Sequence, residues 1–227
     1  FNQNLRSAED FVYKHAISTA ILTAMMSSRL GYNHQKQMSM VAAALLFSIG
    51  YRYVPKAIIE EGNNVTSDDE VIIQQSLERG LNFLSMYQND YEFMPLATNL
   101  CTAYIYSMNP KKALKPDNEL LSMMMVLKIA DTFDRYTAMN LGHEPESEIA
   151  AMRRLSSNKK AFHPDFVNVL SECIHIVPRA ASVDLSDGSK GIILEENTKD
   201  FMHPVILRLS DNQVLDLSLP GVSRQIQ

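Results

Sequence analysis

Apolar residues along the first three quarters of the chain recur every three or four positions, which is the spacing of amphipathic α-helices. A pattern resembling a capping box begins the first predicted helix at Ser7, and Gly31 is suited to end it. A second helix is expected from about Asn33 to Ile49, with Gly50 as its stop. The first helix has one face formed by Phe11, His15, Ser18, Leu22 and Met25, and the second is expected to turn Met38, Val41, Ala42, Leu45 and Leu46 inward.

Prolines and capping patterns mark the starts of the other predicted helices. Proline fits the first turn of a helix, and a capping side chain satisfies the free N–H groups there. Ser67–Glu70 has the capping-box pattern. The predicted helices run from Pro55 through Ile59, from Ser67 to about Met86, from Met94 to Ser107, from Pro116 to about Ala138, from Pro145 to about Asn158, and from Pro164 to about Ile176.

The tail of the chain changes from helical spacing to the alternation that is typical of β-strands. The predicted strands are Ser182–Leu185, Gly191–Glu195, Val205–Leu209 and Gln213–Leu217, and Ser210–Asn212 forms a hairpin turn between the last two. The pattern therefore predicts a mostly α fold, with a helical domain over residues 1–178. Residues 179–227 form a small C-terminal antiparallel β appendage of the same domain.

Composition narrows the class of protein. The chain has 227 residues, 46% of them apolar, which is enough for one sizeable core. Cys101 and Cys173 are far apart and in no metal-binding pattern, so neither a disulfide framework nor a cysteine zinc site is expected.

The net charge of −5 disfavours nucleic acid as a partner. The longest apolar run, Val41–Phe47, is too short to span a bilayer, and no targeting segment is recognised, so a cytoplasmic location is expected.

Several strings, in the right order and spacing, resemble one bacterial family. Leu45–Pro55 is similar to the segment around that family's HD doublet, and Ala130–Thr137 is similar to its A-D-x-x-D-A-L-T string. In the tail, Leu185–Gly188 followed by Gly191 is similar to its L-S-D-G-x-x-G string. The chain thus resembles the HD-GYP family, cyclic di-GMP phosphodiesterases within the HD superfamily. The resemblance implies an HD-type helical bundle.

The same resemblance implies a metal site and shows where its ligands fall. Active members bind two or three metal ions through His, Asp and Glu side chains. Two ligand positions are kept, at His15 and Asp131, and the GYP string is absent. The degenerate ligand positions are Phe11, Phe47, Ser48 and Ser76, and a further His pair falls near Cys101–Ala103. We therefore expect no metal, with Phe47 and Phe11 filling the space, and no other cofactor.

Phosphate-binding side chains are also replaced at the positions that the resemblance indicates. Tyr51 falls where the family has a Lys, and Glu61 and Asn64 fall where its next loop is basic. A phosphodiester needs cations there, and Glu61 would repel it. Hydrolysis of cyclic di-GMP is therefore not expected, nor is tight binding in the old catalytic groove. Stacking of guanine on an aromatic ring would be the remaining route to binding, with Tyr51, Tyr53 and Tyr104 as candidates.

Other features admit more than one interpretation. His15 is either a residual ligand or, as we favour, a histidine hydrogen-bonded to Asp131. Asp131 and Asp134 form an i, i+3 carboxylate pair, for which a structural role with Arg135 is favoured over acid–base catalysis. Arg153 and Arg154 form a speculative anion site near a helix end. The methionines are interpreted as core residues.

Three functions follow from these observations. The first is a catalytically inactive HD-GYP-like domain that acts in cyclic di-GMP-related signalling through a protein partner, a homodimer being one form. The second is a metal-free sensor of a nucleotide or other small molecule that uses the old pocket. The third is a residual metal-dependent phosphohydrolase. A filled pocket with an apolar surface patch would favour the first, and a retained cavity with converging polar groups would favour the second.

Overall fold

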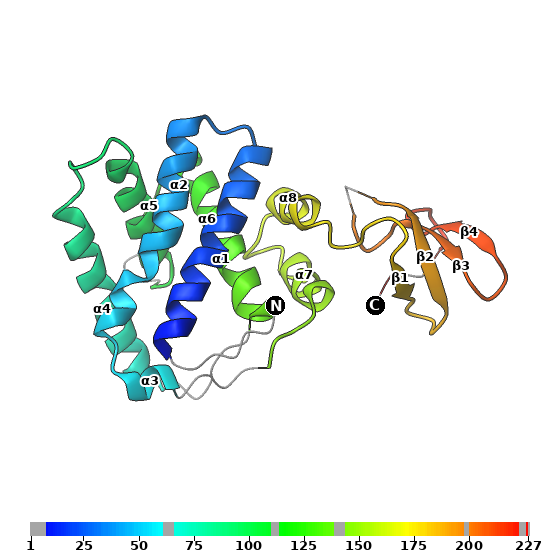
Figure 1. The fold of residues 1–227 in the computed structure, drawn as a ribbon, viewed down its shortest axis with the longest axis horizontal. Helices are drawn as coiled ribbons and strands as arrows, with labels where there is room; N and C mark the ends of the chain where they lie inside the picture. Colours follow the sequence, from blue (N-terminus) through cyan, green and yellow to red (C-terminus); the bar gives the residue numbers. More distant parts are fainter. Residues whose placement is uncertain are drawn as a thin grey trace. The chain divides into compact units, whose positions relative to one another are not determined.

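The computed structural model describes residues 8–60, 66–109, 114–138, 144–197, 200–222 and 226; the side chains of residues 8–11 and 60 are not described. The chain forms two compact units, residues 1–146 and 147–227. Most described residues are helical, and a small antiparallel sheet lies at the C-terminal end (Figure 1). This confirms the predicted fold class. The division into a domain over 1–178 and an appendage over 179–227 stays a prediction.

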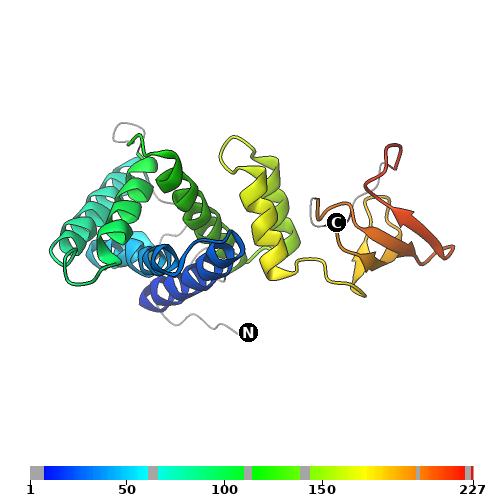
Figure 2. The same cartoon turned by 90° about the horizontal axis from the view of Figure 1, so that it is seen from above.

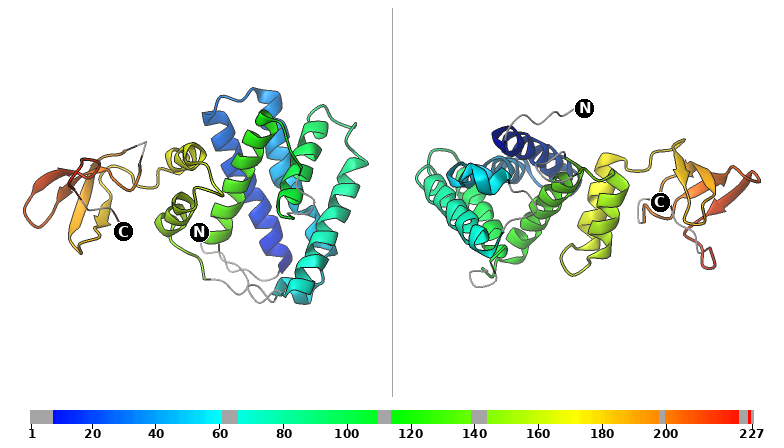
Figure 3. Two further views of the ribbon diagram at one scale, coloured as in Figure 1. Left: turned by 180° about the vertical axis from the view of Figure 1, so that it is seen from behind. Right: turned by 90° about the horizontal axis from the view of Figure 1, so that it is seen from below.

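The first unit is a helical bundle (Figures 1 and 2). Its elements are α1 (Ala8–Arg29), α2 (His34–Leu46), the 3₁₀ segment η1 (Phe47–Tyr53), α3 (Lys56–Glu60), α4 (Ser67–Ser85), α5 (Met94–Ser107) and α6 (Asn118–Thr137). Helix α1 packs against both α2 and α6, as both views of Figure 3 show. This packing brings the N-terminal helix beside a helix more than a hundred residues later in the chain.

Helix ends follow the predicted signals, with small shifts. Gly31 adopts the left-handed conformation after α1, as expected for a C-terminal stop. The capping box before α4 is formed by Thr66 and Asp69, one residue earlier than the predicted Ser67–Glu70. Pro116 and Pro145 were expected in the first turns of their helices, but both lie before the N-caps, which are Asp117 for α6 and Ser147 for the next helix. Side-chain oxygens rather than prolines therefore set these helix starts. The predicted cap at Ser7 lies outside the described residues.

The predicted inward face of the second helix is wrong. Met38 and Leu45 are exposed, whereas Ser39, Met40, Ala43 and Ala44 are buried. Helix α2 is apolar on most of its surface, so hydrophobic spacing could not select the face that packs. The helix also ends earlier than predicted, at Leu46, and continues as the 3₁₀ segment η1 through Gly50 to Tyr53.

Two glycines bring η1 against α4 at backbone contact. A Cβ atom added to Gly80 would lie 2.6 Å from the backbone nitrogen of Gly50, closer than real Cβ contacts allow. One added to Gly50 would likewise collide with the Cα of Leu77. Only glycine permits this approach at either position. The crossing fixes Phe47, Ser48 and Tyr51, which lie on η1, relative to α4.

The described residues of the second unit form two helices and a four-stranded sheet. Its elements are α7 (Glu148–Ser157), α8 (Pro164–Ile174), β1 (Ser182–Asp184), β2 (Lys190–Glu195), β3 (Val205–Arg208) and β4 (Gln213–Asp216). The strands form an antiparallel meander in the order β1-β2-β3-β4, and Ile206 pairs with Ile193 and with Leu215. The predicted strands and the hairpin turn at Ser210–Asn212 are confirmed.

None of the described helices combines the length and the apolar character that crossing a membrane requires.

Candidate functional site

His15 and two aspartates form a buried network between α1 and α6. The Nε2 atom of His15 lies 2.7 Å from Oδ1 of Asp131, and its Nδ1 atom lies 2.6 Å from Oδ2 of Asp134. All three residues are buried. The predicted hydrogen bond between His15 and Asp131 is thus confirmed, and the second bond, to Asp134, occupies the other ring nitrogen.

Asp131 has further partners on both of its carboxylate oxygens. The Tyr104 hydroxyl donates to Oδ2 over 2.5 Å, and Nε of Arg135 donates to Oδ1 over 3.0 Å. Arg135 lies one helical turn after Asp131 on α6, so helical spacing aligns the two side chains. Arg135 therefore pairs with Asp131, the first carboxylate of the i, i+3 pair.

These contacts favour the charged forms of the buried pair. Burial lowers the pKa of His15, but its hydrogen bonds to Asp131 and Asp134 outweigh this and raise the pKa above its ordinary value. Burial raises the pKa of Asp131, but the Arg135 charge and the bonds from His15 and Tyr104 hold it well below the ordinary value. Burial, together with the Asp131 charge, raises the pKa of Tyr104 well above its ordinary value. Tyr104 is therefore a neutral donor to an ionised carboxylate.

Phe47 closes one side of this network. Its side chain is 1% exposed and meets both the His15 ring and the Tyr104 ring edge to face, at centroid distances of 6.1 and 5.5 Å. Ser48, the next residue on η1, is also buried. An aromatic ring therefore packs against His15 on the side where η1 approaches. Phe11, which was expected to share this space, has a side chain outside the described part.

The donor atoms of this network do not fit a metal ion. The two carboxylates contact opposite nitrogens of the His15 ring, so the three side chains do not point at one common position. No group of three or more His, Cys, Asp or Glu side chains suited to a metal occurs within residues 12–59, 66–109, 114–138, 144–197, 200–222 and 226. A metal site needs at least three converging donors with supporting partners. The described residues therefore hold no such set.

Comparison with known families agrees with this architecture. Residues 2–166 match the family model described as "HD domain", which is well over half of the chain. The chain belongs to the HD domain family. The match covers the helices that carry His15, Phe47, Asp131 and Asp134.

Two curated relatives of this HD domain are cyclic di-GMP phosphodiesterases. One, from Pseudomonas aeruginosa, is 20% identical over 204 residues, covering 88% of the chain and 48% of the relative. The other, PdeB of Borreliella burgdorferi, is 33% identical over 61 residues, covering 27% of the chain and 16% of the relative. The chain thus spans about half the length or less of these relatives. Together with the family match, they support the resemblance to HD-GYP domains.

The other degenerate positions are spread over the HD domain. Ser76 is buried on α4, next to the crossing with Gly50. Tyr51 is half-buried on η1 and interacts with Arg135. Glu61 and Asn64 lie outside the described residues. Of the tyrosines considered for stacking, Tyr104 is buried and therefore unavailable, and Tyr53 packs under the Arg79 guanidinium at 4.6 Å.

A hollow of about 550 Å³ lies beside Tyr51. Helix α4 supplies most of its wall, including Glu70, Gln74 and Glu78, and Met108 at the end of α5 contributes to the rim. A volume of this size is within the range of small-molecule pockets. Because two carboxylates line the hollow, it suits an uncharged or cationic ligand better than a phosphate.

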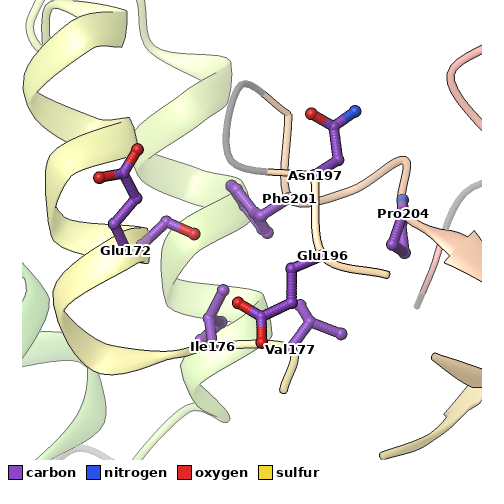
Figure 4. A pocket seen from close by; sticks show the side chains of 8 residues that line it. Glu172, Ile176, Val177, Glu196, Asn197, Phe201 and Pro204 are labelled. Carbon is purple, nitrogen blue, oxygen red and sulfur yellow. The ribbon is translucent and has the colours of Figure 1, made fainter. Parts of the chain in front are cut away.

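A small pocket lies among the described residues of the second unit. This pocket, of about 20 Å³, lies between the end of α8 and the chain around Phe201 and Pro204 (Figure 4), and it has room for about one water molecule. In the speculative anion site, Arg153 donates to the backbone oxygen of Ile226 over 3.1 Å. Arg154 is exposed. An anion site at these two residues stays a prediction.

Sequence reasoning named Arg135 without its partner Asp131, and it missed Tyr104 as a member of the network. The i, i+4 spacing of Asp131 and Arg135 was a local signal for their ion pair. Tyr104 gave no local signal, because its contact with Asp131 depends on how α5 packs against α6.

Proposed function

We propose that this HD domain is catalytically inactive and acts in bacterial signalling related to cyclic di-GMP through contact with a protein partner. The observation that carries the proposal is that the network around His15 is closed. Both ring nitrogens of His15 and both oxygens of Asp131 are taken by protein partners, and Phe47 packs where the resemblance places a metal ligand.

Phosphodiester hydrolysis needs a metal-activated water and positive charge near the phosphate. His15 cannot serve as a base for a substrate in solution, because it is buried and each nitrogen already contacts a carboxylate. The positions that the resemblance assigns to phosphate contacts carry Tyr51, Glu61 and Asn64. These replacements support inactivity, and the domain would then act through its surface. A cytoplasmic location stays a prediction.

The test combines metal analysis with an assay. The protein is produced in cells supplied with iron and manganese, dialysed, and measured by elemental analysis and for cyclic di-GMP hydrolysis beside an active family member. We expect far less than one equivalent of metal and no turnover above background. Retention of about one equivalent or more of iron, manganese or zinc would contradict the proposal, as would turnover that His15→Ala abolishes. Either result would favour a metal-dependent phosphohydrolase.

The hollow beside Tyr51 favours a second candidate function, a metal-free sensor of a small molecule. Calorimetry with cyclic di-GMP tests it directly. Tight binding in this groove is not expected, because phosphates would face Glu70 and Glu78. If cyclic di-GMP binds with a micromolar or tighter dissociation constant and Tyr51→Ala abolishes this binding, the sensor function is established. Binding that only Arg153→Ala with Arg154→Ala removes would instead place a nucleotide site in the second unit.

A further inference from the structure

Helix α1 has an inverted distribution of polar and apolar side chains. Its buried side carries a line of polar residues at four-residue intervals, namely His15, Thr19, Thr23 and Ser27. Its exposed side carries an apolar line at the same intervals, namely Tyr13, Ile17, Ile21 and Met25. Tyr13 is 70% exposed and Ile21 is 56% exposed. Ala16, Ala20 and Met26 are buried as well, so α1 presents apolar side chains on both sides, which is typical of a helix that is covered all round.

Beyond Tyr13 and Lys14, the exposed apolar line has an uncharged setting. No Asp, Glu, Lys or Arg occurs between Lys14 and Arg29 in α1, or between Lys36 and Arg52 in α2 and η1. Helix α2, which packs against α1, also exposes Met38 and Leu45. Depletion of charge is the compositional mark of the centre of a protein interface. A strongly charged partner would find no complementary charge along residues 15–28 of α1 or residues 37–51 of α2 and η1.

We propose that the exposed line Tyr13–Ile17–Ile21–Met25 pairs with the same line of a second copy of this chain. A line of residues four apart is a ridge that fits the groove between such ridges on another helix. The neighbouring row on α1 runs through Lys14, Ser18 and Leu22, which are half-buried, and Ser18 is the smallest of them. The groove between these two rows of α1 can therefore receive the exposed line of a second copy, and two-fold symmetry forms both contacts at once.

The exposed surface supplies more than half of the area that one partner buries in a standard interface. The four ridge residues together with Met38 and Leu45 expose on the order of 500 Å² per copy, against about 800 Å² per partner in a standard interface. Half-buried neighbours such as Ser18 and Leu22 supply more at the rim. The inference goes beyond the proposed function, because an active domain could pair in the same way.

The test measures the oligomeric state of the full chain by sedimentation equilibrium over a range of concentrations. Ile17→Lys with Ile21→Lys places charges in the middle of the ridge, and Val71→Lys is the matched control, since Val71 is 54% exposed on α4. We expect a dimer with a micromolar or tighter dissociation constant, weakened at least tenfold by the ridge variant and less than threefold by the control. Thermal unfolding confirms that each variant is folded, and Ile21→Ser alone replaces the double variant if that one is not.

Three results would overturn the inference. A wild-type protein that stays monomeric above 100 µM would mean that another part of the chain, or a different protein, covers the ridge. A dimer that the ridge variant does not weaken would use another surface, as would one that Val71→Lys weakens equally. Hydrolysis of cyclic di-GMP measured on the same samples separates the two proposals. A dimer that hydrolyses it would contradict only the proposed inactivity, and a monomer that does not would contradict only the proposed pairing.

Discussion

Phe47 meets the imidazole ring of His15 edge to face, with 6.1 Å between the ring centroids and 77° between the ring planes. An apolar ring in this position excludes water from the ion pair that His15 makes with Asp131. Low local polarity strengthens such a pair when it is complete and makes each member costly when its partner is lost. The stability of the first unit should therefore depend strongly on His15.

Replacing His15 by Ala should lower the free energy of unfolding by about 3–5 kcal/mol, because it takes from the buried Asp131 and Asp134 the imidazole that contacts both. Urea unfolding measures this. His34→Ala, at an exposed site, should change stability by less than about 0.5 kcal/mol. Adding Asp131→Asn to His15→Ala should cost less than the sum of the two single changes. A loss below about 1 kcal/mol for His15→Ala would contradict the closed network.

Restoring the HD doublet should not restore a metal site. Phe47→His with Ser48→Asp supplies two of the missing ligand types, but Ser76 and the Cys101–Ala103 stretch still provide none. We expect no metal to be retained after dialysis, and a loss of about 3 kcal/mol because the new carboxylate is buried. Elemental analysis and urea unfolding check both outcomes. About one equivalent of bound manganese or iron would show that fewer ligands suffice than we infer.

The crossing of η1 and α4 should not tolerate a side chain. Gly80→Ala should destabilise the first unit by about 2–3 kcal/mol, although alanine favours helices, because its Cβ would collide with Gly50. Gly31→Ala is the control, since Gly31 has a positive φ of 75° but open space around it. That change should cost only about 1 kcal/mol. Equal losses for the two variants would argue against steric contact as the cause.

Two threonines in α1 should be replaceable without loss. The hydroxyls of Thr19 and Thr23 are buried and have no hydrogen-bond partner within the described part of the chain. Thr23→Val keeps the shape and removes the unsatisfied group, so it should leave stability unchanged or raise it by up to about 1 kcal/mol. Thr102→Val, which removes a 2.8 Å bond to Thr98, should instead lower it. The two variants are compared by the denaturant concentration at the midpoint of unfolding.

Cys101 should be unreactive in the folded protein. Burial raises the pKa of its thiol to about 12, and its Sγ contacts the backbone oxygen of Ala43 at 3.5 Å. In a Cys173→Ser background at pH 8, a disulfide reagent should modify Cys101 no faster than the first unit unfolds. Rapid modification under native conditions, with the midpoint of unfolding unchanged, would contradict this burial.

The positions of the helices and strands could be predicted from the sequence better than the side of each helix that is buried. The helix over Met94–Ser107 was predicted to the residue, because Pro95 and a clear run of apolar positions mark it. The face of α2 was not, because Met38 and Leu45 on its exposed side are as apolar as Met40 and Ala43 on its buried side. At the site, the resemblance indicated His15 and Asp131. The contact of Tyr104 with Asp131 required the packing of distant helices.

The backbone contact between Gly50 and Gly80 also has a mechanical consequence. Side chains between two packed elements can change rotamer and absorb a small displacement, but at this crossing no side chain stands between the backbones of Gly50 and Gly80. A shift of α4 must therefore be passed on to η1 almost undiminished. Phe47 and Tyr51 lie on η1 and would move with it. A force applied to the outside of α4 would therefore be transmitted, through the backbone contact between Gly80 and Gly50, to the residues beside the His15 network.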